Sequence, residues 1–436
     1  MPMHIDMADA RMGRPCECAG TVARSYLPAL VITVSLFFLW GMANNLNDIL
    51  IAQFRKAFTL SDFGTSFVQQ VFYLGYFLLA VPASLVMRRF GYKMAIVLGL
   101  VLYGTGALLF YPAAAASLYQ LFLLGLFVIA AGLAFLETSA NPLMGELGDP
   151  AGATRRLNWA QAANPLGAIT GVLIGRFFIL SGIEHDERAL ATMDAAARTA
   201  FYKAEVQAIA PPYVGIAIVV LLFALAAALV RFPSGAPVQA DGPSGGGRFL
   251  DIFGKPRLLG AVVAQFFYVG AQVGVWSYTI RYAQANAGLN ERGGADALFV
   301  SLVLFAAGRF LGSALMGRAA PVRLLALFAG LSVLLTAAAG MLGGWPGLIA
   351  LVAASFFMSI QFPTIFALGI EGLGPLRRAG ASLIVMAIIG GAGLTALMGL
   401  VSDHRGITSA MFVPMVSFAV VTGFAVLIGR HKEKHG

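Results

Sequence analysis

The chain has 436 residues, of which 59% are hydrophobic and only 11% are charged, and its mean hydropathy is +0.82. Soluble domains carry about a quarter charged residues, so most of this chain is expected to lie in lipid. The formal net charge of +9 does not indicate nucleic acid binding, because the basic residues are scattered between apolar runs and form no single patch.

About twelve apolar runs are long enough to cross about 30 Å of hydrocarbon at about 1.5 Å per residue. The runs are continuously hydrophobic, whereas the strands of an outer-membrane barrel alternate apolar and polar residues. The expected membrane-spanning helices cover residues 27–52, 65–87, 93–112, 118–146, 157–181, 211–231, 259–284, 296–317, 322–342, 346–371, 379–402 and 409–429. The predicted fold class is therefore an all-α integral membrane protein.

A stretch rich in Gly, Pro and Ser divides the chain into six and six predicted helices. We expect an N-terminal tail at 1–26, a six-helix half at 27–231, a linker at 232–258, a second six-helix half at 259–429 and a tail at 430–436. A weak repeat supports this division, because Pro142 and Arg155–Arg156 recur later as Pro363 and Arg377–Arg378. Two such pseudo-symmetric halves enclose a solute site near the membrane midplane in many transporters.

The Lys and Arg clusters fall at the even-numbered turns, as the positive-inside rule requires if both termini face the cytoplasm. We therefore predict a multi-pass protein of the bacterial inner membrane, with both termini and the linker cytoplasmic. The charged segment at 183–210 would then lie outside as a short surface helix or connector.

Two carboxylates within the predicted helices are the strongest functional signal, because an ionised carboxylate at the bilayer centre costs at least about 2.5 kcal/mol. Asp48 shares a helical face with Asn44 and Asn47, although its position also fits a helix end near the headgroups. Glu137 lies deep in its helix with Asn141 one turn further on. A carboxylate that is neutral when occluded and ionised when exposed to water suits a proton-coupled carrier.

Amide and aromatic side chains mark other candidate positions. Asn158, Gln161 and Asn164 follow each other at three-residue spacing, which suits a hydroxyl-rich ligand or, alternatively, hydrogen bonds between helices. Gln265, Tyr268, Gln272 and Trp276 form a mixed stripe in the seventh helix, which favours a cavity lining over simple packing.

For two further residues of the second half, Arg309 and Gln361, the sequence predicts a structural role. Arg309 in the eighth helix either extends to the membrane surface or pairs with a carboxylate. Gln361 before Pro363 indicates a break in the tenth helix.

Several function classes are disfavoured. All five histidines fall outside the predicted helices, so we expect neither a metal nor a haem. Because HExxH, Walker A and GxSxG motifs are absent, we expect no enzyme activity, no cofactor and no ATP-driven transport.

Four strings resemble the fucose:proton symporter family of the major facilitator superfamily. They are FLWGMANNLNDIL at 38–50, LETSANP at 136–142, YVGAQVGVWSYTIRY at 268–282 and SIQFPTIF at 359–366. The resemblance extends from about residue 30 to 428 and implies a major facilitator fold of about twelve transmembrane helices.

The resemblance also implies site residues. Asp48 and Glu137 match the family's proton-coupling carboxylates, with Glu137 also near the sugar, and Gln161 and Asn164 match positions lining the sugar cavity. Other positions matched to the site are Asn45, Trp276, Phe305 and Phe362. The family pattern associated with fucose has a tyrosine at the position of Phe362, so a hydroxyl available to the sugar is missing here.

The predicted function is import of a sugar, L-fucose or a related hexose, with protons by alternating access. A glucose or galactose transporter or a uniporter is the alternative, and an exporter of amphipathic compounds or a membrane-embedded sensor is less favoured. The expected partners are the sugar, protons and the lipid bilayer, with no nucleic acid, and the protein is expected to be a monomer.

Overall fold

The computed structural model describes residues 27–58, 62–147, 152–179, 193–232 and 249–435, although a few side chains in these ranges, that of Asp48 among them, are not described. This part of the chain is almost entirely helical and contains no strand. Eleven of its helical segments are long and apolar enough to cross a membrane. The all-helical membrane fold expected from hydropathy is confirmed.

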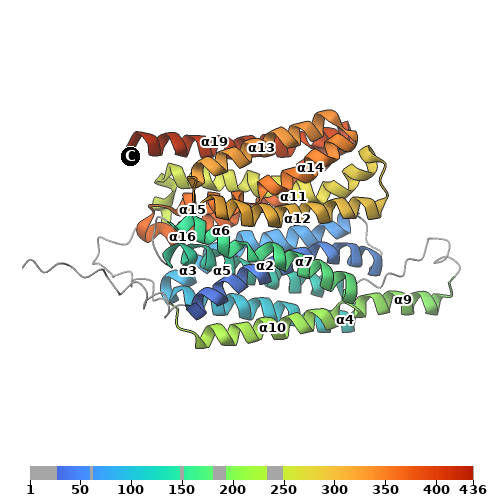
Figure 1. Ribbon diagram of the computed structural model, residues 1–436. Coiled ribbons are helices and arrows are strands. Elements are labelled where there is room, and N and C mark those ends of the chain that lie inside the picture. The colour runs from blue at the N-terminus through green and yellow to red at the C-terminus, as the bar shows by residue number, and fades with distance from the viewer. Residues whose placement is uncertain (1–26, 59–61, 148–151, 180–192, 233–248, 436) are drawn as a thin grey trace, which may run out of the picture.

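The first group of helices runs from blue to green in Figure 1. It comprises α2 (Leu27–Ala57), α3 (Asp62–Leu108), α4 (Phe110–Ala116), α5 (Tyr119–Glu146), α6 (Ala153–Gln161), α7 (Ala163–Ile174), the π-helix η2 (Gly175–Ile179), α9 (Ala195–Gln207) and α10 (Ala210–Leu229). α9 lies within the segment 183–210, where a short surface helix or a connector was expected, and it continues toward α10. Residues 180–192 lie outside the described part.

The second group runs from yellow to red. It comprises η3 (Phe249–Gly254), α11 (Pro256–Ala287), α12 (Glu291–Leu315), α13 (Pro321–Leu342), α14 (Gly344–Met358), α15 (Gln361–Ile370), η4 (Gly374–Leu376), α16 (Arg377–Met386), η5 (Ala387–Ile389), α17 (Gly390–Arg405), α18 (Ile407–Ala410) and α19 (Phe412–His435). The predicted break near Pro363 is confirmed, since α14 ends at Met358 and α15 begins at Gln361.

One apolar segment accounts for two of the twelve predicted crossings. The segment Phe67–Ala116 has 50 residues, which as a straight helix would measure about 75 Å, more than twice the hydrocarbon thickness. Its backbone turns at Gly91, whose φ of 82° and ψ of 175° are not helical. A residue with a Cβ rarely adopts this φ, so glycine permits the turn between the second and third crossings.

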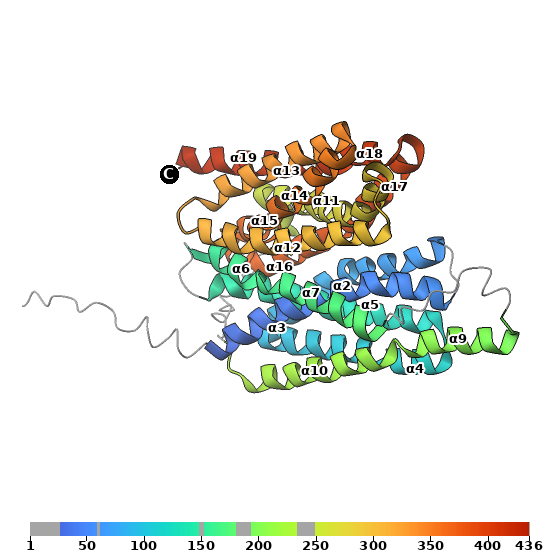
Figure 2. The ribbon, with the colours of Figure 1, turned by 45° about the vertical axis from the view of Figure 1, so that its right-hand side comes forward.

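The two groups form separate layers, the first below and the second above in Figures 1 and 2. Close glycine contacts hold equivalent helix pairs in each layer. A Cβ on Gly167 of α7 would lie 1.9 Å from the carbonyl oxygen of Phe38 in α2, and one on Gly390 of α17 would lie 2.1 Å from that of Phe266 in α11. Small residues that allow backbones to approach are typical of membrane helix interfaces.

Contacts between the layers come from a few helices. α16 packs on α3 and α5, and α15 packs on α5 and α6. The predicted linker falls mostly outside the described residues, so the exact domain boundaries stay a prediction, as do those of the N-terminal tail.

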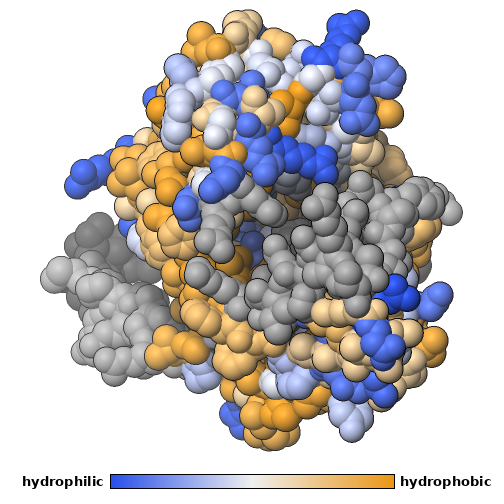
Figure 3. All heavy atoms as spheres, turned by 90° about the vertical axis from the view of Figure 1, so that its right-hand side faces the viewer, coloured by the Kyte–Doolittle hydropathy of each residue, from blue (hydrophilic) through white to orange (hydrophobic). Residues whose placement is uncertain are grey.

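The outer surface suits a lipid environment. Large side chains such as Leu222, Leu225 and Leu229 of α10 are well exposed. Figure 3 looks onto the end of the bundle that carries α9; hydrophilic side chains gather over the upper part of this face, while hydrophobic side chains predominate along its flanks.

Candidate functional site

Glu137 lies in the middle of α5, and only 4% of its surface is exposed. Neither of its carboxylate oxygens meets strict hydrogen-bond geometry with a described donor, and the Nδ2 atom of Asn141, one turn further on, also lacks an acceptor by this geometry, although the two side chains interact. Buried polar groups are normally hydrogen-bonded, and an exception calls for a functional explanation. A carboxylate that is buried and unpaired is suited to exchange a proton or to bind a polar solute.

A chain of hydrogen bonds leads from α5 into the second half. Gln161 of α6 donates from Nε2 to Asn141 Oδ1 at 2.7 Å. Arg309 of α12 donates from Nη1 to the backbone oxygen and to Oε1 of Gln161, at 3.1 and 3.2 Å. Three helices are thus joined through side chains that are almost fully buried.

Two aromatic candidates, Trp276 and Phe305, adjoin Arg309 at the end of this series of hydrogen bonds. The rings of Trp276 and Phe305 meet edge to face at 4.9 Å, and the Arg309 guanidinium lies 4.9 Å from the Phe305 ring centroid. Trp276 donates from Nε1 to Ser355 Oγ at 3.2 Å. The structure therefore brings Trp276, Phe305, Arg309 and Gln161 together.

Phe362 occupies a contact between the halves. Its ring centroid lies 5.7 Å from that of Trp40 in α2 and 6.3 Å from that of Tyr268 in α11. Trp40 in turn donates from Nε1 to the hydroxyl of Tyr76 in α3 at 2.5 Å. Phe362 is surrounded by aromatic rings. Because it lacks the hydroxyl that a tyrosine would have at this position, the surface here is more apolar.

The remaining candidates do not join this cluster through a described contact. Asn164 of α7 is half-buried and donates from Nδ2 to the Phe37 carbonyl oxygen of α2 at 3.3 Å, and Asn45 donates to the Gly41 carbonyl oxygen at 3.1 Å. Gln272 is half-buried in α11 between the turns of Tyr268 and Trp276. Asp48 belongs to α2, but its side chain lies outside the described residues.

Some residues were not selected from the sequence. Trp40 and Tyr76 were missed, although Trp40 precedes Asn44 by one helical turn and so shares its face. Asn158 donates to Thr364 Oγ1 of α15 at 3.2 Å, which is the hydrogen bond between helices that had been left as its alternative role. Arg309 follows neither of its expected roles, since it is 2% exposed and is paired with no carboxylate among the described residues.

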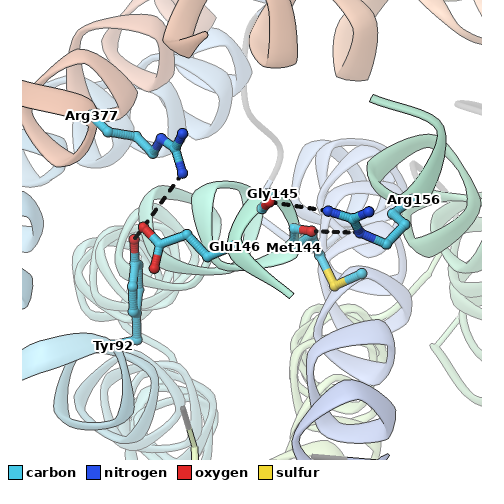
Figure 4. Close-up of polar contacts among 6 residues, drawn as sticks. All are labelled: Tyr92, Met144, Gly145, Glu146, Arg156 and Arg377. Atoms are coloured by element: carbon cyan, nitrogen blue, oxygen red, sulfur yellow. Dashed lines mark hydrogen bonds and ion pairs between the residues drawn. The ribbon is translucent and has the colours of Figure 1, made fainter. Parts of the chain in front are cut away.

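At one end of the bundle the two halves are joined by a group of four residues, Tyr92, Glu146, Arg377 and Arg378, which we call the basic clamp. Arg377 of α16 lies 3.7 Å from the Glu146 carboxylate at the end of α5, which also accepts a hydrogen bond from the Tyr92 hydroxyl at 2.6 Å (Figure 4). Arg378 donates to the Met87 carbonyl oxygen at 3.1 Å and lies over the Tyr92 ring. The two halves are therefore tied together at this end.

A neighbouring arginine supports the clamp from within the first half. Arg156 of α6 donates to the carbonyl oxygens of Gly145 at 3.1 Å and Met144 at 3.4 Å, at the end of α5 (Figure 4). A cation at a helix C-terminus satisfies carbonyl groups that have no partner within the helix. The arginine pairs that indicated topology therefore also hold helix ends in place.

Comparison with known proteins agrees with this architecture. The sequence profile of the Major Facilitator Superfamily matches residues 30–394. The L-fucose-proton symporter of Escherichia coli (strain K12) is 44% identical over 412 residues, which cover 92% of this chain and 93% of that protein. The glucose/galactose transporter of Brucella abortus biovar 1 (strain 9-941) is 33% identical over 421 residues, covering 95% and 97%.

A crystal structure of the transporter FucP in the outward conformation matches this structure with a TM-score of 0.85 at 44% identity, covering 93% of this chain and 99% of that one. The fold and the buried polar site thus define a multi-pass membrane transporter and not an enzyme. The chain belongs to the Major Facilitator Superfamily and, within it, to the family that contains the L-fucose-proton symporter. The family and the fold class predicted from the sequence are confirmed, while the roles of individual site residues stay predictions.

Proposed function

We propose that this protein imports a sugar, L-fucose or a related hexose, together with protons by alternating access. The observation that carries the proposal is Glu137, a buried carboxylate without an ion-pair partner among the described residues, in a membrane helix of a transporter whose relative at 44% identity is an L-fucose-proton symporter. In this proposal Asp48 and Glu137 exchange the protons, and Glu137 also contacts the sugar.

The side chains around Glu137 suit a sugar. Amides both donate and accept hydrogen bonds, as hydroxyl groups require, and aromatic rings offer apolar faces to the C–H groups of a pyranose. We assign sugar contacts to Asn45, Gln161, Asn164, Gln272, Trp276, Phe305 and Phe362. One chain supplies all of them, so a monomer is sufficient for transport.

Glucose or galactose is the second candidate substrate. A glucose/galactose transporter is 33% identical to this chain along 95% of its length. Phe362, between the rings of Trp40 and Tyr268, offers no hydroxyl to a sugar. Both candidates are hexoses, so one screen separates them.

The test is binding of L-fucose, D-glucose and D-galactose to the purified protein, with tryptophan fluorescence as the readout. Asn164→Ala is expected to weaken binding of the preferred sugar by roughly 5- to 150-fold, since loss of one buried hydrogen bond costs about 1–3 kcal/mol. The matched control is Thr170→Ala, which removes an exposed hydroxyl bonded to the Leu166 carbonyl oxygen of the same helix. Equal affinities in the parent and in a folded Asn164→Ala variant would mean that the amide only joins α7 to α2.

The orientation in the membrane is also part of the proposal. The basic clamp, both chain termini and the linker are placed in the cytoplasm of a bacterial cell, in the inner membrane, because the Arg and Lys clusters lie at that end. Because the clamp joins the two halves at this end, we propose that the structure corresponds to an outward-facing state, and its similarity to the outward conformation of FucP supports this proposal.

Reporter fusions test this orientation. Alkaline phosphatase fused at Ser244 is expected to be inactive, and green fluorescent protein at the same position is expected to fluoresce. A phosphatase signal from the Ser244 fusion would reverse the assigned topology.

A further inference from the structure

The buried guanidinium of Arg309 has no role in the function proposed above. It lies on α12 in the second half, is 2% exposed, and forms no ion pair with a described carboxylate. Its Nε atom lacks a hydrogen-bond partner, although the Phe305 ring lies beside it. Because a cation inside a membrane protein is costly, its presence calls for an explanation beyond packing.

The donors and acceptors around Arg309 determine how the side-chain amides of Gln161 and Asn141 are oriented. A guanidinium can only donate, so Gln161 must present Oε1 to it, and the Gln161 NH2 group then points to Asn141. Asn141 must in turn present Oδ1, which leaves its own NH2 group without an acceptor. The orientation of both amides therefore follows from the charge of Arg309.

This donor lies one turn from Glu137 on α5, and the Asn141 side chain interacts with the Glu137 carboxylate, although their atoms do not meet strict hydrogen-bond geometry. The amide dipoles thus run in series from a cation in the second half to a carboxylate in the first half. Hydrogen bonds in such a series polarise one another in a low-dielectric interior. Among the described titratable groups, the Tyr76 phenol of α3, whose oxygen accepts from Trp40, interacts with Glu137, and the Tyr268 phenol of α11 interacts with Arg309.

The bonds from Arg309 to Gln161 cross between the halves, so they depend on the halves being together at this point. We propose that Arg309 is a positioning residue for proton coupling, which links the charge on Glu137 to the contact between the halves through Gln161 and Asn141. The proposal rests on the proposed function. By linkage, if closure of this contact changes proton binding at Glu137, then proton binding changes closure by the same free energy.

The experiment is a double-mutant cycle in proteoliposomes that uses Arg309→Met, Glu137→Gln and the double variant. Arg309→Met is expected to lower sugar accumulation under a pH gradient by about 10-fold or more, with sugar affinity changed by less than about 3-fold. Arg309→Lys keeps the cation and a donor, and is expected to restore part of the accumulation. In the parent protein, Arg309→Met is expected to slow sugar counterflow clearly. In the Glu137→Gln background, the same substitution is expected to change the rate of counterflow by less than about 2-fold.

Thermal unfolding of the same proteins gives a readout that needs no transport. Arg309 and Glu137 make no direct contact in the described structure, so the changes in Tm caused by the two substitutions should be additive if the residues act independently. We expect the changes to be non-additive, because the amides of Gln161 and Asn141 couple the two residues. Asn141→Leu is a second variant for the cycle if Arg309→Met does not fold, and it should show the same dependence on Glu137. Thr336→Val is the control, because this buried hydroxyl of α13 bonds only to backbone oxygens of its own helix.

The outcomes separate this inference from the function on which it rests. Equal effects of Arg309→Met in both backgrounds, in counterflow and in Tm, would overturn the role of Arg309 and leave sugar symport standing. A parent protein that does not accumulate sugar under a pH gradient would overturn the function, while non-additive Tm values would still support the link to Glu137.

Discussion

Glu137→Gln and Asp48→Asn are each expected to abolish accumulation of sugar against its gradient and to leave exchange of labelled for unlabelled sugar largely intact. Each substitution gives a neutral side chain of nearly the same shape, so packing should survive. Net symport requires the empty carrier to release its protons and return, whereas exchange does not. A permanently neutral side chain therefore removes the coupling but not the pathway.

The structure makes the expectation for Glu137 the stronger of the two. Glu137 is 4% exposed and has no ion-pair partner among the described residues. It lies one helical turn from Asn141, which is hydrogen-bonded to Gln161. We therefore expect Glu137→Gln to change sugar affinity as well. The role of Asp48 stays a prediction from the sequence.

The measurement is uptake into proteoliposomes under an imposed pH gradient, compared with counterflow in its absence. Glu371→Gln is the control, because this carboxylate is paired with Arg257 and its side chain is 47% exposed. Accumulation at the parent rate in both Glu137→Gln and Asp48→Asn would show that these carboxylates are structural and would remove proton symport as the function.

Gly167→Ala is expected to destabilise the protein by at least about 1–3 kcal/mol, the usual range for overpacking. The added Cβ would lie 1.9 Å from the carbonyl oxygen of Phe38 and 2.8 Å from its carbonyl carbon. These are backbone atoms, so no side-chain rotation relieves the contact, and α7 must move away from α2. Because α2 and α7 carry Asp48, Asn45 and Asn164, the site would be disturbed too.

Gly390→Ala tests the equivalent contact in the second half, where the Cβ would lie 2.1 Å from the Phe266 carbonyl oxygen. Gly215→Ala is the matched control, since that glycine of α10 has no atom within 4 Å of the added Cβ, and alanine is the better helix former. Thermal unfolding in detergent and the yield of folded protein are the measurements. A Gly167→Ala variant as stable as Gly215→Ala would show that the two helices separate at little cost.

The sequence alone was sufficient for the fold class and for the most informative site residue. Hydrocarbon accepts only backbone whose hydrogen bonds are satisfied internally, so about twelve long apolar runs require a helical bundle. The same solvent makes a carboxylate such as Glu137 costly, which is why one residue in a run of apolar neighbours indicated function. Pro363 likewise predicted the break between α14 and α15, because proline affects its own helix locally.

The partners of the polar side chains were decided only by the tertiary structure. Hydropathy shows which helices enter the membrane but not how each one is rotated about its axis or which helix lies beside it. For this reason Arg309 was expected to reach the surface or a carboxylate, yet it donates to Gln161 in a helix of the other half. The same limit applies to the basic clamp. Arg377 and Arg378 indicated topology through their charge, but their contacts with Glu146 and Met87 depend on α16 packing against α3 and α5.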